Sequence, residues 1–220
     1  MHSRNREKES MVTATQTYPS VVDQLVEQLF QRILNGDYPP GSKVTETQLA
    51  EQLGASRTPV REAIRRLNEL GLIVVRPRCG LEIASVDERD VEEIGALRAE
   101  LEAFAIQLAV PRADTEAIEQ LEQIQQRCET LLDSGSRLEV FREDSRFHLA
   151  IAELSGNRYV HDALKRLDAR VVLCRMMLCR STDKIRNTVG FHRTILRAMR
   201  AHDADRAARA LRDHIENTQI

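Results

Sequence analysis

Apolar residues recur at the spacing of an α-helix along most of this chain. From Ser20 the pattern predicts a helix, which the turn sequence NGDYPPGS ends. The apolar stripe of this helix consists of Val22, Leu25, Val26, Leu29, Ile33 and Leu34. From Asp90 helical spacing runs to the C-terminus, with breaks near residues 111–114, 134–136, 155–157, 180–184 and 201–203. These breaks predict six helices and no strand. The six helices together would form an all-α bundle.

Residues 44–83 show a different order of elements. A short helix is followed by a turn at Gly54 and by a second helix that Gly71 is expected to end. Residues 72–75 and 81–83 then have the apolar character of two short strands joined by a tight connection. Two helices and a turn followed by a β-hairpin predict a winged helix-turn-helix unit.

The second of these helices carries a basic stripe. Arg57, Arg61 and Arg65 recur every four residues and therefore share one face. A separate apolar stripe, suited to packing on a scaffold, consists of Val60, Ile64 and Leu67. A helix that packs on one face and presents arginines on another is typical of a recognition helix in the major groove of DNA. The alternative is a solvated basic helix, and the neighbouring turn and hairpin favour the recognition helix.

The start of this helix is suited to meeting a phosphate group. Ser56 is predicted to cap the helix by accepting a hydrogen bond from an N–H of the first turn. Thr58 and Pro59 follow, and proline is tolerated there because first-turn N–H groups have no helical partner. An uncovered helix start presents amides and the positive end of the helix dipole to DNA. The hairpin tip, with Arg78 and Gly80, can lie against a groove.

Charge and composition fit a DNA-binding protein with a local basic patch. The net charge of the 220 residues is only −2, but residues 56–83 hold six arginines against three glutamates. No apolar run is long enough to span a membrane, and the first ten residues lack the apolar core of a signal peptide. The sequence therefore predicts a cytoplasmic protein with no membrane partner.

The four cysteines have no metal-like spacing and are expected to be free thiols. Cys128 and Cys174 fit small core positions. Cys79, at the predicted wing tip, would be exposed, and a redox role for it is the alternative to an inert thiol.

Four metal-type side chains fall on or beside apolar stripes of the predicted bundle. Asp144 and His148 are four residues apart on its third helix, so both can reach one point. His192 and His214 lie in the middle of the stripes of the fifth and last helices. A single inward histidine is usually a core residue that has found a hydrogen-bond partner. Three on separate helices, with a carboxylate, are more demanding because every buried polar group needs a partner. One divalent metal ion would satisfy all four.

The run LAEQLGASRTPVREAIRRLNELGLIVVRPRCG resembles the DNA-binding domain of GntR-type bacterial transcription regulators. The segment SRTPVREAIRRL is highly specific for this family. The resemblance implies operator contacts from Thr47, Arg57, Thr58 and Arg61, with Gly80 close to the minor groove. Thr47 stands where arginine is common in the family, and Cys79 where a basic or polar residue is common.

The stretches DSRFHLAIAELSGN, HRTILRAM and LRDHI resemble the all-helical effector domain of the FadR-like branch of that family. This resemblance implies that Asp144, His148, His192 and His214 bind a divalent metal. Three imidazoles favour zinc, with nickel or manganese as alternatives. It also implies a homodimer on inverted-repeat, double-stranded operator DNA and a small organic acid as effector.

Arg98, in the run RAELE, falls on an inward face. It would either clamp an effector carboxylate through two parallel hydrogen bonds or pair with Glu102 or Glu100.

The sequence thus predicts a mainly α protein in four segments. A disordered tail (1–19) precedes a winged helix-turn-helix domain (20–83), a linker (84–89) and an all-helical effector-binding and dimerisation domain (90–220). Its expected function is that of a ligand-responsive transcription regulator, with repression as the default, and not an enzyme. The alternatives are a hydrolase that uses a metal-bound water and a regulator that senses the metal itself.

Overall fold

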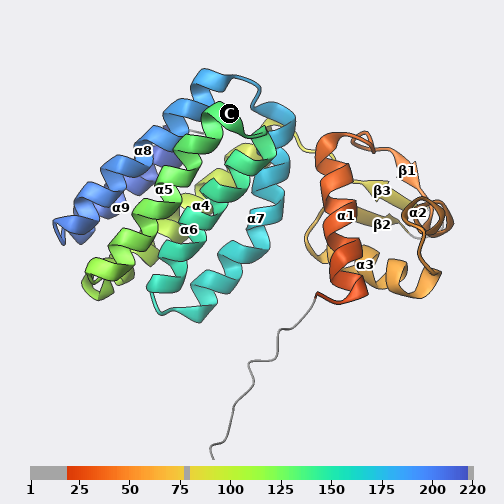
Figure 1. Ribbon diagram of the computed structural model, residues 1–220, viewed down its shortest axis with the longest axis horizontal. Coiled ribbons are helices and arrows are strands. Elements are labelled where there is room, and N and C mark those ends of the chain that lie inside the picture. Colours follow the sequence, from red (N-terminus) through yellow and green to blue (C-terminus); the bar gives the residue numbers. More distant parts are fainter. Residues whose placement is uncertain (1–18, 77–79, 218–220) are drawn as a thin grey trace, which may run out of the picture.

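The computed structural model describes residues 19–76 and 80–217. Most of the predicted N-terminal tail and the wing residues Arg78 and Cys79 therefore lie outside the described residues. Figure 1 shows two parts side by side, a small N-terminal part with helices and a sheet, and a larger helical bundle. The predicted fold class, a winged helix-turn-helix followed by an all-α bundle, is confirmed. No helix among the described residues is long and apolar enough to cross a membrane.

The N-terminal part contains three helices and a three-stranded sheet (Figure 1). The helices are α1 (Val21–Asn35), α2 (Glu46–Leu53) and α3 (Arg57–Glu69). The strands are β1 (Lys43–Val44), β2 (Ile73–Arg76) and β3 (Gly80–Ile83). The sheet is antiparallel with β3 in the centre. The two-residue strand β1 was not predicted, because an isolated pair of residues has no periodicity to reveal it.

Local sequence signals set the ends of these helices. Ser20 and Asp23 cap α1 reciprocally, and Gly36 ends it with a φ of 84°. Gly54 provides the left-handed turn between α2 and α3, with a φ of 62°. The capping bond predicted for Ser56 is wrong: Ser56 has extended backbone at the N-cap position of α3, but its side chain accepts no hydrogen bond from that helix. The first-turn amides of α3 are therefore left without a side-chain cap from Ser56.

The bundle is formed by six helices over residues 88–217, in agreement with the predicted breaks. They are α4 (Glu88–Ala109), α5 (Thr115–Ser134), α6 (Arg137–Leu154), α7 (Arg158–Leu178), α8 (Thr182–Arg200) and α9 (Ala204–Asn217). A short 3₁₀ turn, Val110–Arg112, follows α4. Helix α4 starts at Glu88, two residues before the start that the apolar pattern suggests and inside the predicted linker, because Asp87 and Asp90 form a reciprocal cap.

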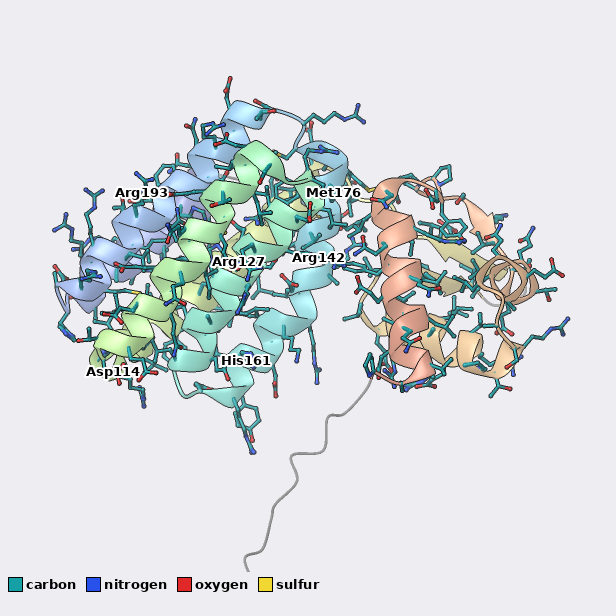
Figure 2. The ribbon with its side chains drawn as sticks, in the orientation of Figure 1. Asp114, Arg127, Arg142, His161, Met176 and Arg193 are labelled. Carbon is teal, nitrogen blue, oxygen red and sulfur yellow. The ribbon has the colours of Figure 1, made fainter. Side chains whose placement is uncertain are left out.

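The two parts share an apolar junction. Leu138 of α6 and Val172 and Leu173 of α7 are buried in the same cluster as the core of the winged helix. Polar contacts add to it, since Arg142 of α6 binds Glu27 of α1 at 2.7 Å. In Figure 2 Arg142 lies on the side of the bundle that faces α1. The bundle therefore contacts the scaffold helix of the DNA-binding part, and movement within α6 or α7 can reach it.

The cysteines in the described part of the chain behave as predicted. Cys128, Cys174 and Cys179 are buried free thiols. Burial raises the pKa of the Cys128 thiol strongly and that of Cys174 to about 11. The thiols of Cys128 and Cys174 are therefore protonated core groups of low reactivity.

Candidate functional site

The predicted DNA-reading residues gather on one exposed surface of the winged helix. The exposed residues are Thr47 of α2, the N-cap residue Ser56, and Arg57, Thr58 and Arg61 of α3. The apolar stripe of α3 is buried. Arg65 extends the surface by one turn. Gly80 opens β3 with a φ of 88°, a left-handed conformation that favours glycine. Arg78, the remaining predicted contact, lies outside the described residues.

Acidic neighbours hold two of these arginines in the free protein. The Arg61 guanidinium donates to both carboxylate oxygens of Glu46, through Nε at 3.1 Å and Nη2 at 2.8 Å. Arg65 binds Glu62 at 2.7 Å and also contacts Glu69. Exposed ion pairs contribute little to stability, so a phosphate or a guanine edge can replace these carboxylates. Arg57 has no ion pair or hydrogen bond to another described side chain, although its charge, after that of Arg61, helps to lower the pKa of Glu46.

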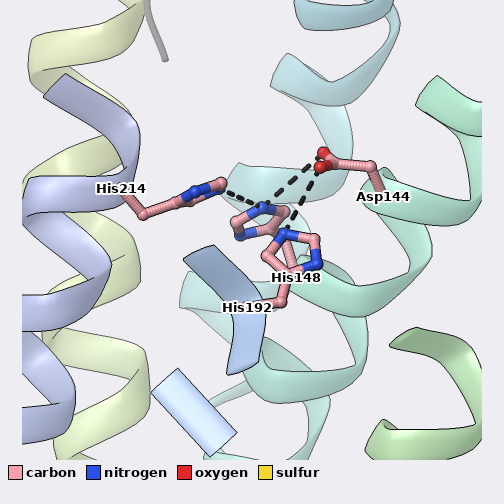
Figure 3. Close-up of side chains that lie close together, drawn as sticks. All are labelled: Asp144, His148, His192 and His214. Carbon is pink, nitrogen blue, oxygen red and sulfur yellow. Dashed lines mark hydrogen bonds and ion pairs between the residues drawn. The ribbon is translucent and has the colours of Figure 1, made fainter. Parts of the chain in front are cut away.

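The four predicted metal ligands meet in the middle of the bundle. Asp144 and His148 come from α6, His192 from α8 and His214 from α9, and all four are buried. One ligand atom from each lies within 4.8 Å of all the others. Figure 3 shows the four labelled side chains pointing toward one another. The folded chain thus brings together residues that are up to 70 positions apart in the sequence.

Distances within this cluster suit a metal ion. Nε2 of His148 is 3.1 Å from Nε2 of His214 and 3.6 Å from Oδ2 of Asp144. Nε2 of His192 is 3.3 Å from Oδ1 of Asp144. Two ligands of a tetrahedral zinc ion with bonds of about 2.0–2.1 Å lie roughly 3.3 Å apart. The observed spacings lie on both sides of that value.

The hydrogen bonding of these atoms also fits a metal. Asp144 Oδ1 and His192 Nε2 are buried, and neither makes a hydrogen bond with a described residue. Buried polar atoms without partners are costly. Both atoms point into the cluster, where a cation would complete their coordination. The donor set of three imidazoles and one carboxylate is therefore chemically and geometrically suited to a divalent ion.

A second layer of side chains holds two of the histidines from behind. Nδ1 of His148 lies 2.5 Å from Oε2 of Glu102 on α4. Nδ1 of His192 lies 2.7 Å from Oε1 of Gln125 on α5. Both contacts engage the nitrogen that faces away from the cluster. This is the arrangement in which outer groups fix the orientation and tautomer of metal-binding histidines.

The ionisation states of the side chains in and around the cluster favour metal binding. Burial opposes ionisation of Asp144, but Arg175 of α7 binds the carboxylate and holds its pKa well below the usual value. Burial likewise opposes ionisation of Glu102, yet Arg98 and His148 lower its pKa to about 2. Burial lowers the pKa of His192, and burial with the neighbouring histidines lowers that of His214 well below its usual value. Ionised carboxylates and neutral imidazoles are the forms that bind metals.

Arg98 lies beside the cluster, as the sequence predicted, and it has a protein partner. Its Nε donates to Oε1 of Glu102 at 2.7 Å, and its Nη2 lies 2.7 Å from the same oxygen. Glu100, the other partner considered, binds Arg212 of α9 instead. Arg98 thus anchors the carboxylate that contacts His148, and this pairing uses only one edge of the guanidinium.

Two residues of this site were missed in the sequence, Gln125 and Arg175. Each left a signal. Gln125 interrupts the apolar stripe of α5 formed by Ile118, Leu121 and Cys128, and Arg175 interrupts the apolar run VVLCRMML of α7. A polar residue in an apolar stripe indicates a buried partner, but the partner's identity depends on long-range packing that the spacing does not reveal.

Comparison with known proteins agrees with these two parts. Residues 21–83 match the family of bacterial regulatory proteins named gntR, and residues 93–217 match the FCD domain. The chain is 30% identical over 195 residues to the HTH-type transcriptional regulator YdhC of Bacillus subtilis, covering 88% of this chain and 87% of that protein. It is 29% identical over 199 residues to a probable D-xylose utilization operon transcriptional repressor of Paenarthrobacter nicotinovorans, covering 90% and 87%.

A solved structure shows the same fold over most of the chain. McbR/YncC of Escherichia coli superimposes with a TM-score of 0.76 and 26% sequence identity, covering 90% of this chain and 94% of that one. These relatives are regulators of transcription and not enzymes, which removes the hydrolase alternative. The chain therefore belongs to the GntR family of bacterial transcription regulators, in the branch that carries an FCD domain.

Proposed function

We propose that this protein is a ligand-responsive repressor whose affinity for operator DNA is controlled by a small organic acid bound at a metal site in the bundle. The convergence of Asp144, His148, His192 and His214 in the core carries the proposal. The probable D-xylose operon repressor among the relatives supports the direction of control.

Operator recognition is assigned to the exposed surface of α3 with α2 and the wing. Arg57 and Arg61 would reach guanine edges or phosphates near the start of the helix. Thr47, Ser56 and Thr58 would contact the backbone beside them. Arg65, Arg78 and Gly80 would follow the phosphates and the minor groove at the periphery.

The charge balance of the buried cluster supports an anionic effector. Asp144 and Glu102 contribute two negative charges, which Arg98 and Arg175 already offset. Burial raises the pKa of the nearby Asp168, which opposes a third negative charge. A divalent ion adds two positive charges and supplies a coordination position for a carboxylate. Uncompensated charge in a buried site is costly, so an anion is the ligand that completes it. Arg98, with one edge of its guanidinium outside the Glu102 contact, is placed to bind a second carboxylate oxygen.

Zinc is the metal that the donor set favours, with nickel or manganese as alternatives. A regulator that senses the metal itself would use the same four ligands. Operator affinity measured at varied metal, first without the acid and then with it, separates the two functions. Metal alone changes the affinity in the sensing case, whereas in ours the affinity changes only when acid and metal are both present.

The unidentified acid can be found by a thermal-shift screen of metal-loaded protein against small organic acids. An acid at 100 times its Kd should stabilise the folded protein by about 2.7 kcal/mol. The protein without metal is the control, and it should show no shift with the same compound. A panel of metabolic and sugar acids that shifts neither form would contradict an acid effector.

A homodimer on an inverted repeat is proposed, with α4 as the interface. Leu97 and Phe104 lie seven residues apart on one face of α4 and are about half exposed, and Leu101 and Leu108 lie between and beyond them. Exposed apolar residues in one stripe indicate a contact surface, and a second copy of the same stripe is a matching occupant.

Replacing Phe104 with glutamate should therefore convert the dimer to a monomer and weaken operator binding, because paired half-sites supply much of the specificity. Light scattering at micromolar concentration measures the mass. Val21→Glu is the matched control, since Val21 is also exposed but lies on α1. A monomeric wild type, with and without operator, would refute the dimer, and a dimeric Phe104→Glu would refute this interface.

A further inference from the structure

Gln125 occupies a position that its neighbours restrict closely. It lies on the inner face of α5, only 4% exposed, between the backbone of α8 and the metal-site residue His192. Its carboxamide contacts three different groups. Nε2 donates to the carbonyl oxygen of Val189 at 2.9 Å and to Oε1 of Glu129 at 2.8 Å, and Oε1 lies 2.7 Å from Nδ1 of His192.

These contacts fix which way the carboxamide points. The Val189 carbonyl and the ionised Glu129 carboxylate can only accept hydrogen bonds, so both must face the NH₂ group. The amide oxygen is thereby left toward His192. An oxygen in that place accepts a hydrogen bond from a proton on Nδ1 of His192, and a neutral imidazole carries only one ring proton. The remaining nitrogen, Nε2, then has a free lone pair.

That lone pair lies on the side of the cluster. Nε2 of His192 is 3.3 Å from Oδ1 of Asp144 and makes no hydrogen bond with any described residue. The orientation is also supported from outside, because Glu129 is held by Arg193 of α8 at 2.6 Å. Figure 2 places Arg193 on the outer side of the bundle. A chain of hydrogen bonds therefore runs from the surface to the metal site.

We propose that Gln125 is a positioning residue that holds His192 in the Nδ1–H tautomer, so that Nε2 is presented to the metal. Glu129, anchored by Arg193, holds Gln125 in turn. This inference rests on the proposed metal site, but the tautomer of His192 is already set in the metal-free protein. His148 is oriented differently, by the charged carboxylate of Glu102 at 2.5 Å.

The positioning role requires a neutral amide at position 125, and a polar side chain of another kind should not replace it. At His148 a carboxylate serves, because Arg98 neutralises it. At position 125 a carboxylate would face the Val189 carbonyl and Glu129 without a donor to offer either. Gln125→Glu should therefore weaken the site, although a carboxylate behind a histidine ordinarily strengthens metal binding.

The first test measures the affinity of the full-length protein for Zn²⁺ by competition with a chelator. We expect Gln125→Leu to weaken binding by about 10- to 100-fold, as is usual when an outer hydrogen bond to a metal-binding histidine is lost. Gln125→Glu should weaken it as well. Gln126→Leu is the matched control, since Gln126 is exposed and adjacent, and its affinity should equal that of the wild type.

The second test determines the tautomer of His192 by ¹⁵N NMR of histidine-labelled, metal-free protein. The wild type should show Nδ1–H, and Gln125→Leu should lose that preference. Glu129→Leu, which alters only the outer support, should weaken zinc binding in the same direction but less. It also keeps the inference testable if Gln125→Leu does not fold.

An Nε2–H tautomer in the wild type, or equal zinc affinity in Gln125→Leu, overturns the positioning role and leaves the metal site intact. Absence of zinc uptake by the wild type instead overturns the metal site.

Discussion

Leucine in place of His192 or His214 is expected to lower the affinity for a divalent metal by more than about 100-fold, a larger loss than removal of an outer hydrogen bond causes. Each histidine is fully buried, and each offers Nε2 to the same cluster, so no other described side chain can take its place. Wild-type protein purified without chelator should carry one ion per chain, measured by elemental analysis.

His161→Leu is the matched control for this experiment. His161 is partly exposed on α7 and outside the cluster, so its loss should leave the metal content unchanged. Leucine is chosen because an apolar side chain of similar size leaves little cavity and adds no polar group of its own. Thermal unfolding in chelator checks that the variants fold. Wild type that neither carries nor takes up metal would show that the cluster is a buried polar network.

Alanine at Arg57 or Arg61 is the change expected to affect operator binding most. If the arginine reads a guanine edge, its loss should weaken binding by about 5- to 150-fold and relax specificity at one base pair. The exposed ion pair between Arg61 and Glu46 does not compete strongly with DNA for Arg61, because such pairs contribute little to stability. Titration of labelled operator by fluorescence anisotropy measures the effect.

Two other arginines on α3 serve for comparison. Arg65→Ala should weaken binding to all sequences similarly, because a phosphate contact carries no sequence information. Arg66→Ala is the control, since Arg66 binds Asp23 of α1 at 2.6 Å and belongs to the scaffold side. If Arg57→Ala and Arg61→Ala both bind the operator as tightly as wild type does, α3 does not read the DNA as placed here.

Periodicity predicted the parts of the fold that depend on local sequence. The α3 stripe is buried, and the α1 stripe is buried except for Val22 and Val26, which are half-buried. The six bundle helices are interrupted where polar and small residues break the pattern. The metal cluster could also be anticipated, because His192 and His214 stand in the middle of apolar stripes. Local spacing, however, could not show the strand β1 or the missing cap at Ser56. Those features depend on the pairing of β1 with β3 and on the geometry of one side chain.

The sequence could not show which partner each buried polar side chain would bind. Arg98 could pair with Glu100, with Glu102 or with an effector, and its helical spacing allowed each of them. Packing of α9 against α4 decides the matter, because Arg212 takes Glu100 and leaves Glu102 to Arg98 and His148. Gln125 and Arg175 were missed for the same reason, since their partners are 67 and 31 positions away.

The central claim is that an organic acid acts on DNA binding through the metal. Its most direct test is the operator affinity of wild type and His214→Leu, each measured with and without metal and with the acid from the thermal-shift screen. The operator is the sequence that wild type selects from random DNA. We predict that the acid weakens operator binding only in metal-loaded wild type, and that operator weakens acid binding by the same factor. An equal effect of the acid in metal-free wild type or in His214→Leu would contradict the account.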